Sequence, residues 1–450
     1  MGGVKNALLP GLGGPMGRHA RPVGVWFDPR PWVILLATGL FLLVVLRHVP
    51  CIQTGDEPVN TYIRLCYSDL PLQYVPQNEQ ALQPFSQGSL KAPPLVAALM
   101  TLAMVAARWL YPVGADGSGE VAGANAYFAI STVLLFVAFL VWALSAMLLG
   151  RDSKQGRYRS WDGLLIAGAP VVFASGLISW ELVPIAVSSV ALLLYARGKP
   201  AAAGVMFGLA AASGPLSIPV LMAVAAAAGL AAGWRPMLRV VLSAAASWLL
   251  VQSPLLVLAP ELVAGYYRGL VESPVGYGSL WFVLQGFGVQ IRDVGPLGYL
   301  LLVIYWLLAL TVLYLRRRRP RVGSMIAVLL IPAILLGPSF SPQLGLWLWF
   351  ALVLSRPYRW ELAAMTVVEL GYFAAVWGLL SGHLTYDDSV PNNLYYLALL
   401  LRIAVATVIV AESFLDIASP RRDALRRRPA DDPLGGKLAA AAKPAEMAAA

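Results

Sequence analysis

Apolar segments of helical length recur along this chain, separated by polar segments. They lie near residues 31–47, 92–111, 125–150, 161–178, 182–196, 201–233, 237–258, 294–315, 322–337, 344–355, 360–380 and 394–415. Several approach the roughly 20 apolar residues that a helix needs to cross a bilayer. Only 12% of the residues are charged, whereas a soluble domain carries about 25%. The sequence therefore predicts an all-α polytopic membrane protein and excludes a large soluble fold.

Most of the 33 Lys and Arg residues lie in short clusters between or beyond the apolar segments. Clusters of this kind mark the cytoplasmic side of a membrane protein. The net charge of +10 is therefore explained by topology, and we expect no nucleic-acid partner. We expect residues 1–30 to be a cytoplasmic segment ahead of an uncleaved anchor. Residues 416–450 are rich in Ala, Pro and charge, which predicts a disordered cytoplasmic tail.

The basic clusters also predict how often the chain crosses the membrane. The stretch 201–233 has basic residues at both ends, so we expect it to enter and return, with a break at the "SGP" of 213–215. Three crossings before 151–159 would place that basic cluster outside, so we expect segment 92–111 to be re-entrant or interfacial. The prediction is about twelve transmembrane helices in one membrane domain, 31–415, with a long first extracytoplasmic loop.

That first loop contains "YIRLCYSDLPLQYV", residues 62–75, in which one carboxylate lies among aromatic and apolar residues. The alternation is typical of an amphipathic segment at a membrane surface. A carboxylate there is partly desolvated, which raises its basicity and suits a general base. Asp69 is therefore the candidate base, Asp56 is the more solvated rival, and an ordinary solvated loop is the simpler alternative. Cys51 and Cys66 are the only cysteines and both lie in this loop, as either a disulfide or two free thiols.

Other candidate binding residues lie near the remaining outer segments. Arg402 lies within the last apolar segment, where an arginine is either functional or extends toward the interface. Glu369 is its buried partner or a protonated acid. The further candidates for a phosphate or substrate site are Arg64, Arg268, Arg292, Trp180, Glu181 and His383. We find no metal-ligand spacing, P-loop, dinucleotide fingerprint or nucleophile elbow, so we expect no metal and no cofactor.

Four stretches, in order, resemble motifs of glycosyltransferase family 87. "YSDLPLQY" resembles the Asp-containing segment after the first helix of that family, and "KAPPLVAALM" at 91–100 resembles the start of its next helix. "ISWELVPIAVSSVALLLYARGKPAAAGVMFGLAAASGP" at 178–215 and "SFSPQLGLWLWFALVL" at 339–354 resemble two later motifs. Together the matches extend over about residues 60–355.

The resemblance implies the GT-C fold and an enzyme that transfers mannose or arabinofuranose from a polyprenyl-phosphate donor. The acceptors of that family are glycolipids and polysaccharides outside the cytoplasmic membrane of actinobacteria, so membrane lipids are expected partners and the active site is expected to face outside. By this resemblance Asp69 occupies the position of the catalytic base. Trp180–Glu181 replaces the Trp–Asp of the family.

The chain also departs from the family pattern. "SGP" stands at 213–215 where the family has a basic residue, and "PQNEQALQPF" at 76–85 replaces the usual pattern after the first motif. A catalytically degenerate scaffold of the same fold is therefore one alternative. A lipid or sugar transporter, with "SGP" as a broken helix at its substrate site, is another.

Overall fold

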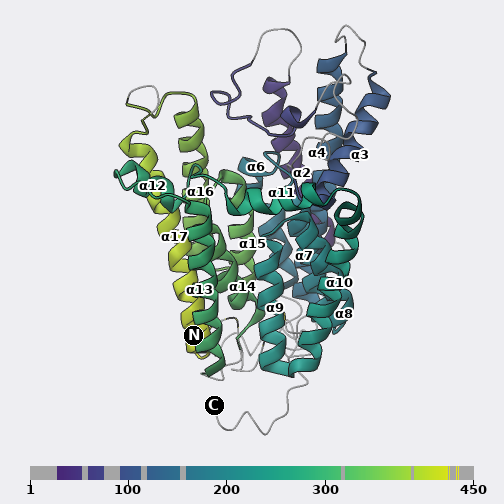
Figure 1. Ribbon diagram of the computed structural model, residues 1–450, viewed down its shortest axis with the longest axis vertical. Coiled ribbons are helices and arrows are strands. Elements are labelled where there is room, and N and C mark those ends of the chain that lie inside the picture. The colour runs from purple at the N-terminus through teal and green to yellow at the C-terminus, as the bar shows by residue number, and fades with distance from the viewer. Residues whose placement is uncertain are drawn as a thin grey trace, which may run out of the picture.

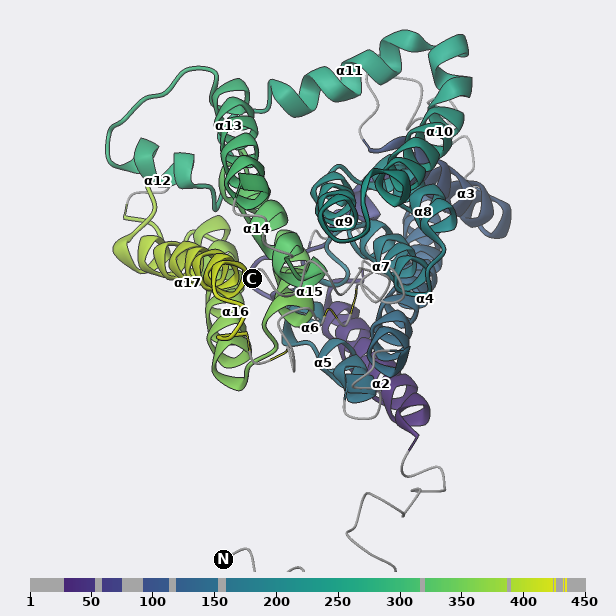
Figure 2. The same cartoon turned by 90° about the horizontal axis from the view of Figure 1, so that it is seen from below.

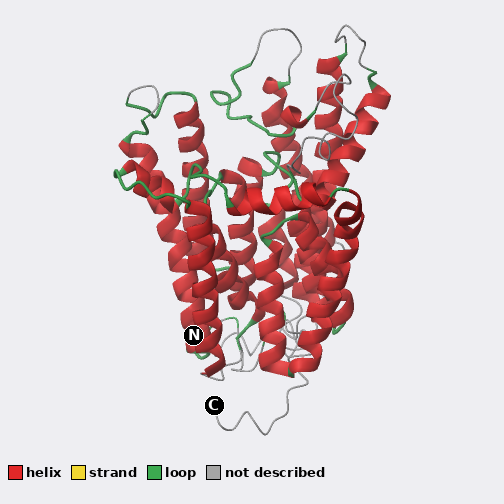
Figure 3. Ribbon diagram, viewed as in Figure 1, coloured by secondary structure: helices red, strands yellow, loops and turns green. Residues whose placement is uncertain are grey.

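The computed structural model describes residues 28–52, 59–74, 92–112, 119–152, 159–315, 320–386, 390–423, 425, 432 and 434. Within those residues the secondary structure is helical and contains no strand, apart from an isolated bridge between Thr385 and Pro391 (Figure 3). The helices are α2 Pro29–His48, α3 Pro94–Leu110, α4 Glu120–Asp152, α5 Gly163–Ala167, α6 Pro170–Ser175, α7 Leu182–Ala196, α8 Pro200–Ser213, α9 Ser217–Ala232, α10 Trp234–Leu258, α11 Pro260–Val271, α12 Leu280–Gly286, α13 Val294–Leu315, α14 Val322–Leu335, α15 Gly345–Ser355, α16 Arg359–Leu380 and α17 Asn393–Ala418.

Among the described residues, six helices are long and apolar enough to cross a membrane. They are α2, α4, α10, α13, α16 and α17. The remaining helices have at most 17 residues, fewer than the roughly 20 that a single crossing needs. The prediction of an all-α protein is confirmed, and these six helices have the length and composition that membrane crossing needs, whereas the count of twelve crossings is not confirmed.

Local sequence explains where these helices begin and end. Pro occupies the first turn of several of them, including α2, α6 and α8, where its missing N–H costs no hydrogen bond. The Asn392 side chain caps α17 by accepting from the backbone N–H groups of Leu394 and Tyr395, each at 3.1 Å. The expected break at "SGP" is present, because α8 ends at Ser213 and α9 begins at Ser217. The apolar segment 161–178 is also interrupted, between α5 and α6, just before a proline.

Two helices depart from a simple bundle. Figure 1 and Figure 2 show α11 lying across the bundle axis, and it contacts both α10 and α13. It begins the stretch 259–293 between the apolar segments 237–258 and 294–315, and its buried residues include Leu262 and Val263. The segment expected to be re-entrant or interfacial, 92–111, forms the 17-residue α3, which packs on α4.

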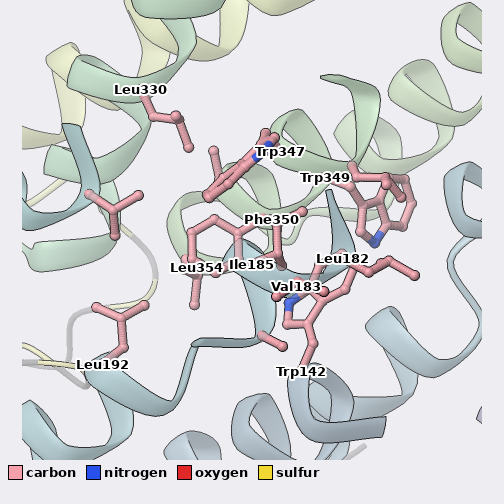
Figure 4. Close-up of a cluster of buried hydrophobic side chains, with 14 of the residues drawn as sticks. Trp142, Leu182, Val183, Ile185, Leu192, Leu330, Trp347, Trp349, Phe350 and Leu354 are labelled. Atoms are coloured by element: carbon pink, nitrogen blue, oxygen red, sulfur yellow. The ribbon is translucent and has the colours of Figure 1, made fainter. Parts of the chain in front are cut away.

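The core lies where α4, α7, α14 and α15 meet. Figure 4 shows Trp142, Trp347 and Phe350 at its centre, among aliphatic side chains from α7 and α14. The Trp347 and Phe350 rings meet edge to face at 5.7 Å, and the Trp142 ring lies 6.3 Å from Phe350. The Trp349 indole N–H donates to the Leu165 carbonyl at 2.9 Å, so its polar atom is satisfied inside the core. This core fixes the positions of α7 and α15, and those helices carry part of the candidate site.

The C-terminal segment begins differently from the prediction of a disordered tail over 416–450. Helix α17 continues to Ala418. The buried Asp423 carboxylate then accepts from the Arg321 Nε at 2.8 Å, and both side chains are at most 1% exposed. Leu434 is also buried, with 5% of its surface exposed. A buried charge requires a partner, so this ion pair holds at least the start of the segment on the bundle. The other residues expected to form the tail lie mostly outside the described part.

Candidate functional site

The described part of the loop after α2, residues 59–74, lies against the turn between α6 and α7. We refer to it as the Asp69 loop. The Ser68 hydroxyl donates to the Leu177 carbonyl at 2.5 Å, and the backbone N–H of Asp69 donates to the Ile178 carbonyl at 2.9 Å. These two bonds join segments more than 100 residues apart in the sequence. They bring together the two motifs that the sequence nominated separately.

The base of the Asp69 loop is fastened to the end of α2. Cys51 and Cys66 form a disulfide with their Cα atoms 6.2 Å apart, which confirms the bridge and excludes the two free thiols. The exposed Arg64 donates from its Nη1 to the Pro50 carbonyl at 2.5 Å. Arg64 was expected as a phosphate ligand, but the structure places its guanidinium on the backbone beside the disulfide.

The Asp69 carboxylate is half-buried and has one described polar partner. The Tyr67 hydroxyl donates to it, and this bond favours the ionised form. Burial acts in the opposite direction and is stronger, so the pKa of Asp69 lies above its ordinary value. Burial and the neighbouring carboxylate also raise the pKa of Tyr67, so the hydroxyl keeps its proton. A positioned carboxylate with raised basicity is the group that a general base requires.

The turn between α6 and α7 supplies a second carboxylate. The Trp180 indole N–H donates at 3.0 Å to Gln73 of the Asp69 loop, which also accepts from the Tyr127 hydroxyl at 3.4 Å. The partly buried Glu181 accepts from the Trp347 indole N–H at 2.6 Å. Burial raises the pKa of Glu181, and the bond from Trp347 opposes that rise. Trp180 thus supports the Asp69 loop, and Glu181 is the residue that follows Trp180 in the sequence.

An aromatic cluster covers the other side of the Asp69 loop. The rings of Tyr62 and Tyr67 stack at 5.2 Å, and both contact Trp377 of α16, at 5.8 and 5.0 Å. Phe373, one turn before Trp377, packs edge to face against it at 5.8 Å. Flat rings next to a carboxylate are suited to the apolar faces of a sugar.

Arg47, at the end of α2, is the functional candidate that the sequence reasoning missed. Its Nη1 donates to the Ala174 carbonyl at 2.9 Å, and the guanidinium lies 5.1 Å from the Phe373 ring and 5.5 Å from the Phe173 ring. Its Nε is buried without a hydrogen-bond partner, and no described carboxylate forms an ion pair with it. The available signal was its place in the sequence: it ends the first apolar segment, next to His48.

Arg402 has a different role from the one expected. Its Nε and Nη2 donate to the two Glu369 oxygens at 2.8 and 2.9 Å, and its two terminal nitrogens donate to the Phe340 and Ser341 carbonyls at 2.6 and 3.3 Å. The guanidinium lies between the rings of Phe340 and Tyr372, at 3.6 and 4.3 Å. The side chain is fully buried, so it neither extends to the interface nor remains available to a phosphate. Its partner is Glu369, the alternative that the sequence had left open.

The other expected site residues are not brought to Asp69 by any described contact. Arg268 on α11 and Arg292 before α13 are exposed. His383 is exposed as well, and its Nδ1 lies 2.9 Å from the Ser381 hydroxyl. Asp56, the rival base, lies outside the described residues. No described contact therefore places any of these side chains in the candidate site.

The assembled site consists of the Asp69 carboxylate, the aromatic cluster and the turn that carries Glu181. The Arg47 guanidinium joins it through the Phe373 ring, which packs on Trp377 of that cluster. In the part of the chain that the structure describes, no group of three or more His, Cys, Asp and Glu residues could hold a metal ion. The chemistry available to these side chains is proton transfer at a carboxylate and anion binding at a guanidinium. No protein-family model matches the sequence, and no curated protein matches it either.

Proposed function

We propose that this protein is an integral membrane glycosyltransferase that moves a sugar, most plausibly mannose, from a polyprenyl-phosphate donor to a cell-envelope glycolipid or polysaccharide. The observation that carries the proposal is the environment of Asp69. A half-buried carboxylate of raised pKa is held by a backbone bond to Ile178 next to a cluster of aromatic rings, and the Arg47 guanidinium packs on Phe373 of that cluster. The resemblance of four ordered motifs to glycosyltransferase family 87 supports the same activity.

In this proposal Asp69 takes the proton from an acceptor hydroxyl as the hydroxyl oxygen attacks the anomeric carbon of the donor sugar. The bond between that carbon and the phosphate oxygen breaks in the same displacement, so the configuration inverts. The polyprenyl phosphate leaves with the bonding electrons and gains negative charge. The raised pKa of Asp69 matches it better to a hydroxyl proton than a fully solvated carboxylate would be.

Arg47 is the cation that we assign to the leaving phosphate. A guanidinium presents donors in a planar fork that fits phosphate oxygens, and Arg47 retains a buried Nε without a partner. The Arg402 guanidinium cannot serve, because Glu369 already neutralises it. Among the arginines nominated from the sequence, neither Arg268 nor Arg292 has a described contact that brings it to Asp69.

The membrane arrangement that we propose has the Asp69 loop outside the cytoplasmic membrane, with the shorter apolar helices completing about twelve crossings. Arg235 and Arg239 lie near the turn between α9 and α10, at the lower end in Figure 1. Arg356 follows α15 and pairs with Asp416 near the end of α17. Basic residues at this end favour a cytoplasmic location for it.

The decisive test is Asp69→Asn in a transfer assay with a short-chain polyprenyl-phosphate mannose, using purified protein in lipid nanodiscs. The amide keeps the shape but cannot accept the proton, so we expect the rate to fall about 10²–10⁴-fold with little change in donor binding. Glu261→Gln on the exposed surface of α11 is the matched control, because it removes a carboxylate outside the site and leaves the base in place. Asp56→Asn tests the rival base. Near-normal transfer by Asp69→Asn, with Asp56→Asn inactive, would overturn the assignment of the base.

A transporter is the second candidate, favoured by the interruption between α8 and α9 and by the buried charges within α16 and α17. Interrupted helices and intramembrane charges are common at transporter substrate sites. Both Arg402 and Glu369 are, however, occupied by each other. Flux of a labelled polyprenyl-phosphate sugar into protein-containing liposomes, without any transfer product, would favour this candidate. The absence of both flux and transfer would favour the degenerate scaffold.

A further inference from the structure

A groove of about 950 Å³ lies between the Asp69 loop, the end of α2 and the beginning of α4. Its walls combine aromatic rings with small polar groups. The rings include Tyr62, Tyr67 and Phe128, and the polar groups include Asn60, Thr61 and Glu120. The volume lies within the range of about 300–1,000 Å³ that is usual for pockets holding small organic ligands.

The lining determines which kind of ligand fits. An isoprenoid chain offers no hydrogen-bond partner, so a chain that filled the groove would separate the Thr61 hydroxyl and the Glu120 carboxylate from water without replacing their bonds. A sugar has hydroxyls that both donate and accept, and its C–H faces pack on aromatic rings. The mixture of rings and polar groups therefore matches a polyhydroxylated ligand.

Tyr67 connects the groove to the candidate base. Its ring lines the groove, and its hydroxyl donates to the Asp69 carboxylate. The next residue, Ser68, also lines the groove and is anchored to the Leu177 carbonyl at 2.5 Å. Asp69 itself does not line the groove, so a saccharide seated against Tyr67 must extend one hydroxyl past that side chain for the carboxylate to take its proton.

We infer that this groove is the acceptor site and that it binds the saccharide part of the acceptor. The inference rests on the proposed function and adds to it, because it places the acceptor between the Asp69 loop and α4. The guanidinium of Arg47 packs on Phe173 and Phe373, which do not line the groove, and its Nη2 lies 3.5 Å from the Nε2 of His48, which does. The donor phosphate at Arg47 and the acceptor sugar in the groove would then be neighbours across His48.

The test fills the groove from α4. Ala124 lines it and is partly buried, whereas Ala129 of the same helix is exposed and does not line it. Ala124→Trp should weaken acceptor binding by about ten-fold or more, and Ala129→Trp is the matched control for inserting a tryptophan into α4. Thr61→Val is a nearly isosteric second variant that removes one groove hydroxyl, and it should weaken binding about five-fold. Donor KM should stay unchanged in all three.

Binding is measured in nanodiscs by saturation-transfer NMR with free mannobiose and arabinobiose, and transfer is measured with the octyl glycosides of the same disaccharides. Preference for the octyl glycoside would indicate a glycolipid acceptor. Equal use of the free disaccharide would indicate a polysaccharide acceptor. The inference is overturned if the wild-type protein binds neither disaccharide, or if Ala124→Trp keeps wild-type binding and acceptor KM. The wild-type protein could also bind a disaccharide, lose that binding in Ala124→Trp and show no transfer. This result would support the groove as a saccharide site and refute the proposed enzyme activity.

Discussion

Replacing Arg402 by leucine removes one half of a buried ion pair. The side chains of Arg402 and Glu369 are 0% and 3% exposed, and two hydrogen bonds of 2.8 and 2.9 Å join them. The substitution leaves the Glu369 carboxylate in an apolar environment with no cation. It also removes the donors that reach the Phe340 and Ser341 carbonyls. The change therefore acts on stability and not on donor binding.

The expected magnitude follows from which groups lose their partners. Breaking a buried pair by removing one member costs about 3–5 kcal/mol, because the remaining charge is not compensated. The carbonyl of Phe340 would add about 1–3 kcal/mol if it remained unpaired. Replacing both members by apolar residues removes the unpaired charge, so Arg402→Leu/Glu369→Leu should recover most of the loss.

The measurement is reversible unfolding of purified protein in mixed micelles, with the wild type, both single variants and the double variant forming a cycle. We expect each single variant to lose several kcal/mol and the double variant to lie much closer to wild type. An Arg402→Leu protein with wild-type stability would refute the reasoning. So would a double variant that loses the sum of the two single losses, since that result would mean that the two residues do not interact.

Three further predictions concern the Asp69 loop, its disulfide and the segment after α17. Because burial raises the pKa of Asp69, the transfer rate should fall as the pH is lowered through that raised pKa. The fall should begin at a higher pH than it would for a solvated aspartate. A transfer rate that does not change over the acidic pH range would contradict this. Reducing the disulfide between Cys51 and Cys66 should lower the free energy of unfolding by about 3 kcal/mol, measured as a lower midpoint of thermal unfolding. In intact cells both thiols should react with a membrane-impermeant reagent only after reduction. Arg321→Met removes the cation that pairs with the buried Asp423, so added protease should cleave the segment after α17 faster. Unchanged cleavage would show that the ion pair does not hold this segment on the bundle.

The sequence was sufficient wherever the physical cause is local. Apolar segments and basic clusters predicted an all-α protein with membrane-spanning helices, because membrane crossing depends on the composition of each segment. The interruption at 213–215 was predictable from Gly and Pro, which disfavour a continuous helix. The disulfide was a stated alternative, because Cys51 and Cys66 lie in one loop. The number of crossings was less predictable, since several apolar segments form helices too short to span a membrane alone.

Only the tertiary structure decided which charged side chains are free. Arg402 and Glu369 are 33 residues apart, and Arg321 and Asp423 are 102 apart, so no local pattern reveals either pair. The same limitation hid Arg47, which ends an apolar segment in the sequence but lies against Phe373 of α16 in the fold. A charge in a membrane segment must find a partner or a polar ligand, and helix packing determines which of these it finds. The residue types alone therefore established that Asp69 could act as a base, whereas packing against the turn after α6 established its burial and its neighbours.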